Sequence, residues 1–158
     1  MATPGNSGAP SLGLSLMLNV GDLVFDPGTG DLDIVREQHA LSQALQLAVQ
    51  TQVGSDRINV GFGFDQLSVG AYAYDIHTRK EYVKMQLVKA VTGDRRVRDV
   101  REIFFRDDPR YFELHSIDAL SQQQIIARAR ASREYTVYVV IDTISNDTLT
   151  IEAGATLG

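Results

Sequence analysis

The segment Tyr135-Thr-Val-Tyr-Val-Val-Ile141 most constrains how this chain can fold, because every residue in it is β-branched or aromatic. Ser145-Asn-Asp147 follows as a turn, and Leu149-Thr-Ile151 resumes the β-forming pattern. The sequence therefore predicts an antiparallel pair of strands near the C-terminal end.

Three segments have the spacing of amphipathic helices. In residues 37–53, apolar side chains recur three and four positions apart. A second helix is expected to start at Thr78, because Thr78-Arg-Lys-Glu81 is a capping box, and to end at Gly93. Residues 118–132 form the third predicted helix, with arginines toward its end.

Shorter extended segments fill the rest of the chain. Residues 22–26 and 31–35 alternate on either side of a Pro-Gly turn and predict either a short hairpin or two extended segments joined by that turn. Residues 97–105 predict a strand, and 111–114 predict a returning strand after a turn at 107–110.

Residues 57–65 are glycine-rich and predict an ordered loop. Phe62 and Phe64 are expected to pin this loop to the core, and Asp65 is expected to cap a short helix that continues to Tyr74. Leu67 is expected to face inward from that helix.

Together these elements predict an α+β fold: a small, mostly antiparallel sheet packed against two main helices in a single domain. The length of 158 residues fits one domain, which is expected to cover 14–158. Residues 1–13 are small, polar and rich in Pro and Gly, and they predict a disordered N-terminal tail.

Charge is unevenly distributed along the chain. The net charge is −5, but residues 79–110 hold ten Lys and Arg against six Asp and Glu, and the remainder carries −9. This asymmetry indicates a basic face that meets an acidic protein neighbour or nucleic acid. The interleaved acids disfavour nucleic acid, because they would repel phosphates.

Recognisable catalytic chemistry is absent from the sequence. There is no cysteine, no Gly-x-Ser-x-Gly elbow and no phosphate-binding loop, and His39, His77 and His115 have no second ligand at metal-binding spacing. We therefore expect no enzyme activity, no cofactor and no metal. The alternative left open is a cell-wall glycosidase that uses a carboxylate pair, since such a pair need only meet in space.

The order of several motifs resembles one known family. Asp31-Leu-Asp-Ile-Val35 is followed by a helix bearing Gln43, then Leu47-Ala-Val-Gln-Thr51 with Gly54, then the glycine loop and a second helix over 83–91. Asp94-Arg-Arg96 follows that helix. This pattern resembles the W-like baseplate wedge proteins, also called sheath initiators, of contractile phage tails and related contractile injection systems.

The resemblance is incomplete. The family has Glu-Pro-Arg where this chain has Asp94-Arg95-Arg96, so only the last arginine is kept. Ser55 stands where an acid is usual, and the helix over 118–132 is an addition.

The resemblance implies a virion structural protein of the tail baseplate, assembled in the cytoplasm without membrane insertion. Its implied partners are baseplate wedge subunits and the sheath protein, with tail tube or hub proteins as further neighbours and no nucleic acid. Proteins of this family offer strands that the first ring of sheath subunits completes by β-augmentation. Arg96 is expected to pair with a carboxylate, either on a wedge subunit or within this chain.

The candidate edge strands are 135–141 and 148–152, and the alternative is that this hairpin forms the core of the sheet. The predicted partner-binding residues are Asp94, Arg95, Arg96, Tyr135, Val137, Val139, Ile141, Leu149 and Ile151.

Overall fold

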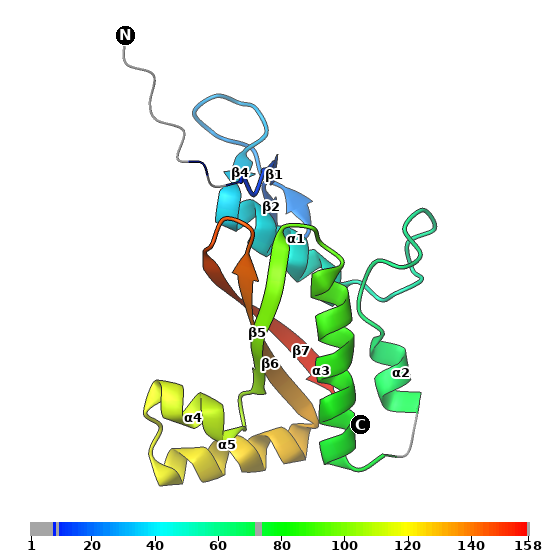
Figure 1. The fold of residues 1–158 in the computed structure, drawn as a ribbon, viewed down its shortest axis with the longest axis vertical. Helices are drawn as coiled ribbons and strands as arrows, with labels where there is room; N and C mark the ends of the chain where they lie inside the picture. Colours follow the sequence, from blue (N-terminus) through cyan, green and yellow to red (C-terminus); the bar gives the residue numbers. More distant parts are fainter. Residues whose placement is uncertain (1–7, 9, 72–73, 158) are drawn as a thin grey trace.

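The computed structural model describes residues 8, 10–71 and 74–157. It has the predicted α+β architecture, with five helices and three small antiparallel sheets among the described residues. Figure 1 shows strands β1–β4 at one end of the molecule, beyond helix α1, and helices α4 and α5 at the other end.

The main sheet consists of β5 (Val97–Phe105), β6 (Glu134–Thr143) and β7 (Thr148–Thr156), in that spatial order. The β6–β7 hairpin pairs without interruption from Glu134↔Thr156 to Asp142↔Thr148. The β5–β6 ladder contains two register shifts, which are β-bulges or local irregularities. The predicted C-terminal strand pair is therefore confirmed and is longer than the sequence pattern indicated.

Alternate residues of β6 enter two different cores. Tyr135, Val137, Val139 and Ile141 are buried in the main core, against α1 (Glu37–Gln50) and α3 (Ile76–Thr92). These two helices are the predicted main helices. Successive side chains of a strand point to opposite faces, so Tyr138 and Val140 face the other way.

The second core contains Phe104, Tyr111 and Phe112, packed against Tyr138 and Val140. It is covered by α4 (Pro109–His115) and α5 (Ala119–Ser132). The rings of Tyr111 and Tyr138 stack with 5.4 Å between their centroids. The predicted helix over 118–132 is therefore confirmed as α5, and it covers this second face of the sheet.

The predicted returning strand at 111–114 is wrong, because these residues lie in α4. Asp108 is at the N-cap position and Pro109 opens the helix. Proline is favoured in the first helical turn because its φ is already helical and its missing N–H has no partner there. The aromatic residues that resembled a strand pack into the second core from this helix instead.

The predicted cap of the second main helix is also wrong. Helix α3 begins at Ile76, and the Asp75 side chain accepts a hydrogen bond from the Thr78 N–H at 3.3 Å. Hydrogen bonds from Thr78 lower the pKa of Asp75. The capping residue is therefore three positions earlier than the capping box indicated.

The short helix α2 covers Gln66–Ala71, and the Asp65 carboxylate caps it by accepting from the Ser68 N–H at 3.2 Å. Leu67 is exposed rather than inward, and Val69 is the buried residue of this helix.

The remaining strands are short. β1 (Leu14–Leu16) pairs with β4 (Ile34–Arg36), and β2 (Leu18–Asn19) pairs with β3 (Asp22–Leu23). The predicted hairpin of 22–26 with 31–35 is reduced to the single bridge Phe25↔Leu32.

The predicted tail ends too late. Leu12 is only 1% exposed and belongs to the main core. The prediction of disorder for residues 1–7 lies outside the described residues.

Replacing Asp75 by alanine should lower the free energy of unfolding by about 1 kcal/mol, because the α3 amides lose their side-chain acceptor. Asp75→Asn keeps an acceptor and should change stability far less. Urea denaturation measures both variants. Equal stability of Asp75→Ala and the wild type would contradict the assignment of the cap.

Candidate functional site

The predicted contact residues Asp94 and Arg96 face each other in the turn between α3 and β5. The Arg96 Nε and Nη2 atoms donate to Asp94 Oδ1 and Oδ2 at 2.9 and 2.6 Å. These hydrogen bonds lower the pKa of Asp94 and raise the pKa of Arg96, while desolvation of each group opposes the shift. The third nitrogen, Nη1, donates to the Leu12 carbonyl oxygen at 2.9 Å.

The other side of Leu12 is held by Glu37, the first residue of α1. Glu37 Oε2 accepts from the Leu12 N–H at 2.7 Å, and Oε1 accepts from the Ser11 hydroxyl at 2.7 Å. The hydrogen bond from the Leu12 backbone is the largest cause of the lowered pKa of Glu37. The Leu12 side chain thus lies in the core, and its backbone N–H and C=O are hydrogen-bonded to Glu37 and Arg96. We call Glu37, Asp94 and Arg96 the Leu12 bracket.

Arg96 was expected to pair with a carboxylate either on a wedge subunit or within this chain, and the bracket shows the second. Its carboxylate partner is Asp94 of this chain, and three of its nitrogens are already used in hydrogen bonds. Arg95 differs, because its side chain is exposed. Of the predicted Asp94–Arg96 contact site, Arg95 is therefore the member that the structure leaves on the surface.

A cleft of about 760 Å³ adjoins the bracket. Its floor is made by the C-terminal half of α1 and by α3, and its lining residues include Leu47, Phe62, Lys89 and Arg95. The cleft joins the three parts of the sequence that carried the family resemblance: the glutamine-bearing helix, the glycine loop and the Asp94–Arg96 turn.

Gly63 allows the loop to approach α1 closely. It has φ +116°, and a Cβ atom there would lie 2.4 Å from the Thr51 carbonyl oxygen. Phe64 is buried as predicted, but Phe62 is 41% exposed, so the prediction that both rings pin the loop to the core is wrong for Phe62. Its ring is instead an apolar wall of the cleft.

The strand residues predicted to bind partners are mostly interior. The sheet core takes the side chains of Tyr135, Val137, Val139, Ile141 and Ile151, and Leu149 is half-buried against it. The prediction of 135–141 as an edge strand is also wrong, because β6 is paired on both sides. The alternative, that the hairpin forms the core of the sheet, holds for β6.

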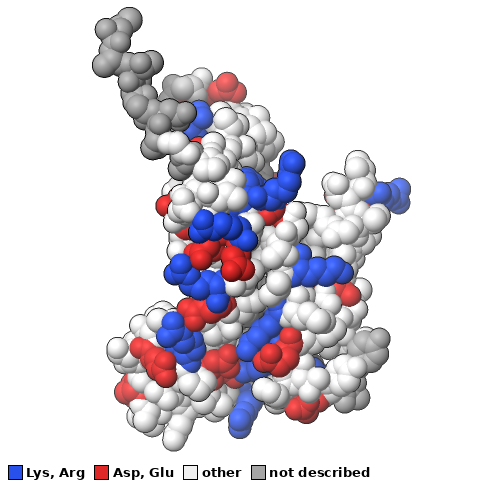
Figure 2. Space-filling model, in the orientation of Figure 1, with Lys and Arg blue, Asp and Glu red and all other residues white. Residues whose placement is uncertain are grey.

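The basic segment 79–110 does not form an unbroken basic face. Three further cations pair with acids: Arg110 with Glu102, Arg101 with Asp142 and Lys84 with Glu81. In Figure 2, blue and red side chains are interspersed over the visible face. Paired acids weaken phosphate binding, and the absence of a nucleic-acid partner stays a prediction.

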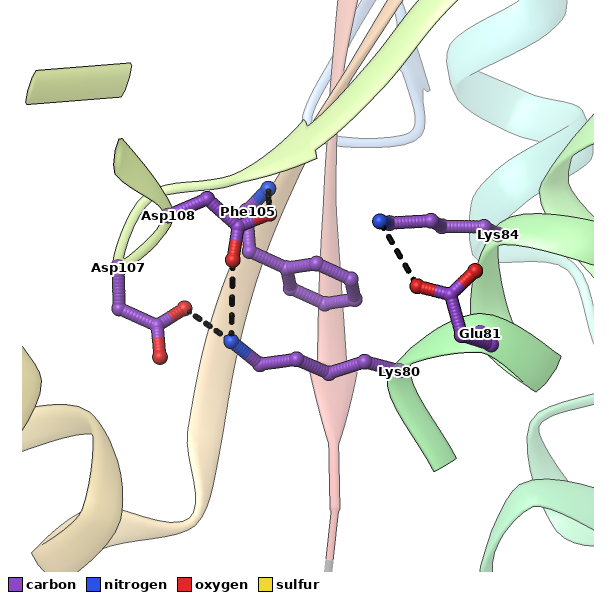
Figure 3. A network of polar contacts seen from close by, with 6 residues as sticks. All are labelled: Lys80, Glu81, Lys84, Phe105, Asp107 and Asp108. Carbon is purple, nitrogen blue, oxygen red and sulfur yellow. Dashed lines mark hydrogen bonds and ion pairs between the residues drawn. The ribbon is translucent and has the colours of Figure 1, made fainter. Parts of the chain in front are cut away.

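Lys80 is the most enclosed of these cations (Figure 3). It reaches from α3 past the Phe105 ring, with Nζ 4.8 Å from the ring centroid, to Asp107 Oδ1 at 2.7 Å and Asp108 Oδ1 at 3.4 Å. Asp108 also accepts from the Phe105 N–H at 2.8 Å. This network joins α3 to the turn between β5 and α4. The adjacent carboxylates of Asp107 and Asp108 therefore have structural partners within the domain.

Within residues 8, 10–71 and 74–157, no three His, Cys, Asp or Glu side chains are grouped so that they could hold a metal ion. In the same part of the chain, no helix is long and apolar enough to cross a membrane. The absence of enzyme activity and of a cofactor stays a prediction.

Comparison with models of known protein families finds no match. Comparison with curated protein sequences also finds none.

Replacing Arg96 by lysine should lower the free energy of unfolding by about 1–2 kcal/mol, since one ammonium group cannot reproduce the paired bonds to Asp94 and the bond to Leu12. Arg95→Lys is the matched control and should change stability by less than about 0.5 kcal/mol. Chemical denaturation compares the two. Equal losses would contradict the bracket.

The bracket also predicts a pH dependence. Because folding lowers the pKa of Asp94 and of Glu37, their stabilisation is complete above the ordinary carboxyl pKa of about 4 and is lost as the pH falls through the lower folded values. Asp94→Asn should be less stable than the wild type at neutral pH and should lose less stability on acidification. Denaturation at a series of pH values measures this, and parallel profiles would contradict it.

Proposed function

We propose that this protein is a structural component of the baseplate of a contractile tail or injection system. It binds wedge subunits and templates the first ring of sheath subunits by accepting a strand. The motif order that resembles the sheath initiators supports this proposal. The observation that carries it is the outer edge of β7, where no further strand is paired among the described residues.

β7 is better suited than β5 to accept a strand. Its nine residues pair with β6 in regular register, whereas β5 contains two register shifts. Bulges bend and twist a strand and so discourage edge-to-edge pairing. A long, regular edge offers another chain evenly spaced donors and acceptors.

The pairing pattern indicates which β7 groups face outward. The Leu157 N–H donates to the Arg133 carbonyl oxygen at 2.9 Å. Because backbone hydrogen bonds alternate along an antiparallel strand, the N–H and C=O groups of odd-numbered β7 residues bond to β6, and those of even-numbered residues point away from β6. Gln46 of α1 is consistent with this pattern, because it donates to the outward Glu152 carbonyl oxygen at 2.9 Å. An added strand would therefore begin along Thr148 and Thr150, beyond the reach of that contact.

The cleft beside the Leu12 bracket is the surface we assign to a wedge subunit. Phe62 and Leu47 are partly exposed there, and Arg95 and Lys89 line it with positive charge. An apolar centre with a charged rim is the usual composition of a protein–protein interface. The assignment moves the predicted anchor from Arg96 to Arg95, because Arg96 is engaged within the chain.

Replacing Thr150 by proline tests strand addition. The Thr150 N–H points away from β6, so proline should remove an outward donor without removing a β6–β7 hydrogen bond. Binding to the contractile-sheath subunit encoded in the same genome should weaken by at least about tenfold, measured by biolayer interferometry.

Thr150→Ala keeps the N–H and is the matched control, with binding expected to stay within about twofold of the wild type. Circular dichroism and cooperative unfolding establish that the proline variant is folded. A folded Thr150→Pro variant that binds the sheath subunit normally would refute strand addition at β7. A genome with no sheath gene would refute the wider proposal.

A further inference from the structure

Helix α1 lies against β7, and two of its glutamines contact the chain at different points along that strand. Hydrogen bonding from Gln38 is the largest cause of the lowered pKa of Asp147, which places Gln38 at the turn before β7. Gln46 donates from Nε2 to the Glu152 carbonyl oxygen at 2.9 Å. The two contacts therefore lie on either side of residues 148–151, the first part of β7.

The carbonyl group that Gln46 contacts belongs to the outer edge of β7. Even-numbered residues of this strand point their N–H and C=O groups away from β6, and an added strand would hydrogen-bond to them in succession. In order along the strand they are Thr148, Thr150, Glu152, Gly154 and Thr156. The Gln46 carboxamide therefore lies partway along the edge that an added strand would cover.

A glutamine side chain can take the place of a neighbouring strand, because its carboxamide has the same kinds of donor and acceptor as a backbone peptide unit. Gln43 of the same helix uses both groups. Its Nε2 donates to Leu16 O at 2.8 Å, and its Oε1 accepts from the Leu18 N–H at 2.9 Å. Gln46 likewise supplies to Glu152 the N–H that an added strand would supply, at the distance of an ordinary backbone hydrogen bond.

The helix holds Gln46 in this position. Its neighbours Leu45, Ala48 and Val49 are buried, and the Gln46 side chain is itself half-buried. An added strand that reached Glu152 would have to displace the carboxamide and leave its donor partly buried without a partner. An unpaired buried donor costs more free energy than a typical hydrogen bond contributes. Pairing is therefore unfavourable at Glu152 and favourable at Thr148 and Thr150.

We infer that Gln46 ends strand addition on β7 before Glu152, and that it thereby sets the length and the register of the accepted strand. This inference rests on the proposed function. The accepted strand bonds to one N–H and one C=O group at each of Thr148 and Thr150. A partner strand shifted toward Glu152 would lose its bonds at Thr148 and gain none at Glu152, so a single register is favoured.

A second proline variant tests where the accepted strand ends. The Glu152 N–H points away from β6, so Glu152→Pro should remove an outward donor, keep the carbonyl group that Gln46 contacts and remove no β6–β7 hydrogen bond. Affinity for the contractile-sheath subunit encoded in the same genome should stay within about twofold of the wild type in biolayer interferometry. Thr150→Pro, in contrast, should bind at least about tenfold more weakly. Glu152→Ala is the control for loss of the side chain.

Removing the Gln46 carboxamide should lengthen the accepted strand. In Gln46→Ala the Glu152 carbonyl oxygen becomes available, so the affinity for the same subunit should rise about two- to tenfold, the effect of one further net hydrogen bond. Adding Glu152→Pro to Gln46→Ala should remove most of this gain. Gln50→Ala is the matched control, because Gln50 is an exposed glutamine one turn later on α1, and it should leave the affinity unchanged.

The outcomes separate this inference from the proposed function. If Thr150→Pro weakens binding and a folded Glu152→Pro weakens it equally, the strand passes Glu152 and the inference is wrong while strand addition stands. The same conclusion follows if Gln46→Ala binds no more tightly than Gln50→Ala, a comparison that also decides the matter if Glu152→Pro does not fold. Normal binding by a folded Thr150→Pro would instead refute strand addition, and the inference with it.

Discussion

Strand β6 is the central strand of the main sheet, and it separates the two cores. Its alternate side chains pack against α1 and α3 on one face and against α4 and α5 on the other, and its backbone pairs with β5 and β7. A strand buried on both faces and paired on both sides has no group left for a partner. This arrangement directs any strand addition to β7, since the other edge strand, β5, has an irregular ladder.

Two charged side chains of residues 79–110 join parts of the domain that are distant in sequence. Lys80 joins α3 to the turn before α4, and Arg96 joins the start of β5 to the backbone of Leu12. Both contacts are partly shielded from water, where hydrogen bonds to charged groups are stronger than at the surface. Lys80 and Arg96 of the basic segment thus make contacts within the domain. Arg95 is the member of the Asp94–Arg96 turn that remains exposed.

Sequence periodicity predicted the long helices and the C-terminal strands, because burial of one face imposes that periodicity. It failed where the same local sequence pattern fits two kinds of structure. Tyr111 and Phe112 resemble a strand, but Pro109 at a helix start and the second core favour a helix. The small, polar neighbours of Leu12 predict a tail, but its burial depends on Glu37 and Arg96, which are distant in sequence.

The proposed function requires that β7 accept a strand from the sheath subunit. Hydrogen–deuterium exchange at the Thr148 and Thr150 amides tests it most directly, because these N–H groups point away from β6. The account predicts fast exchange of both amides in the free protein and slowing by at least about tenfold in the complex with the sheath subunit. A stable complex in which both amides still exchange at their free rates would contradict the account.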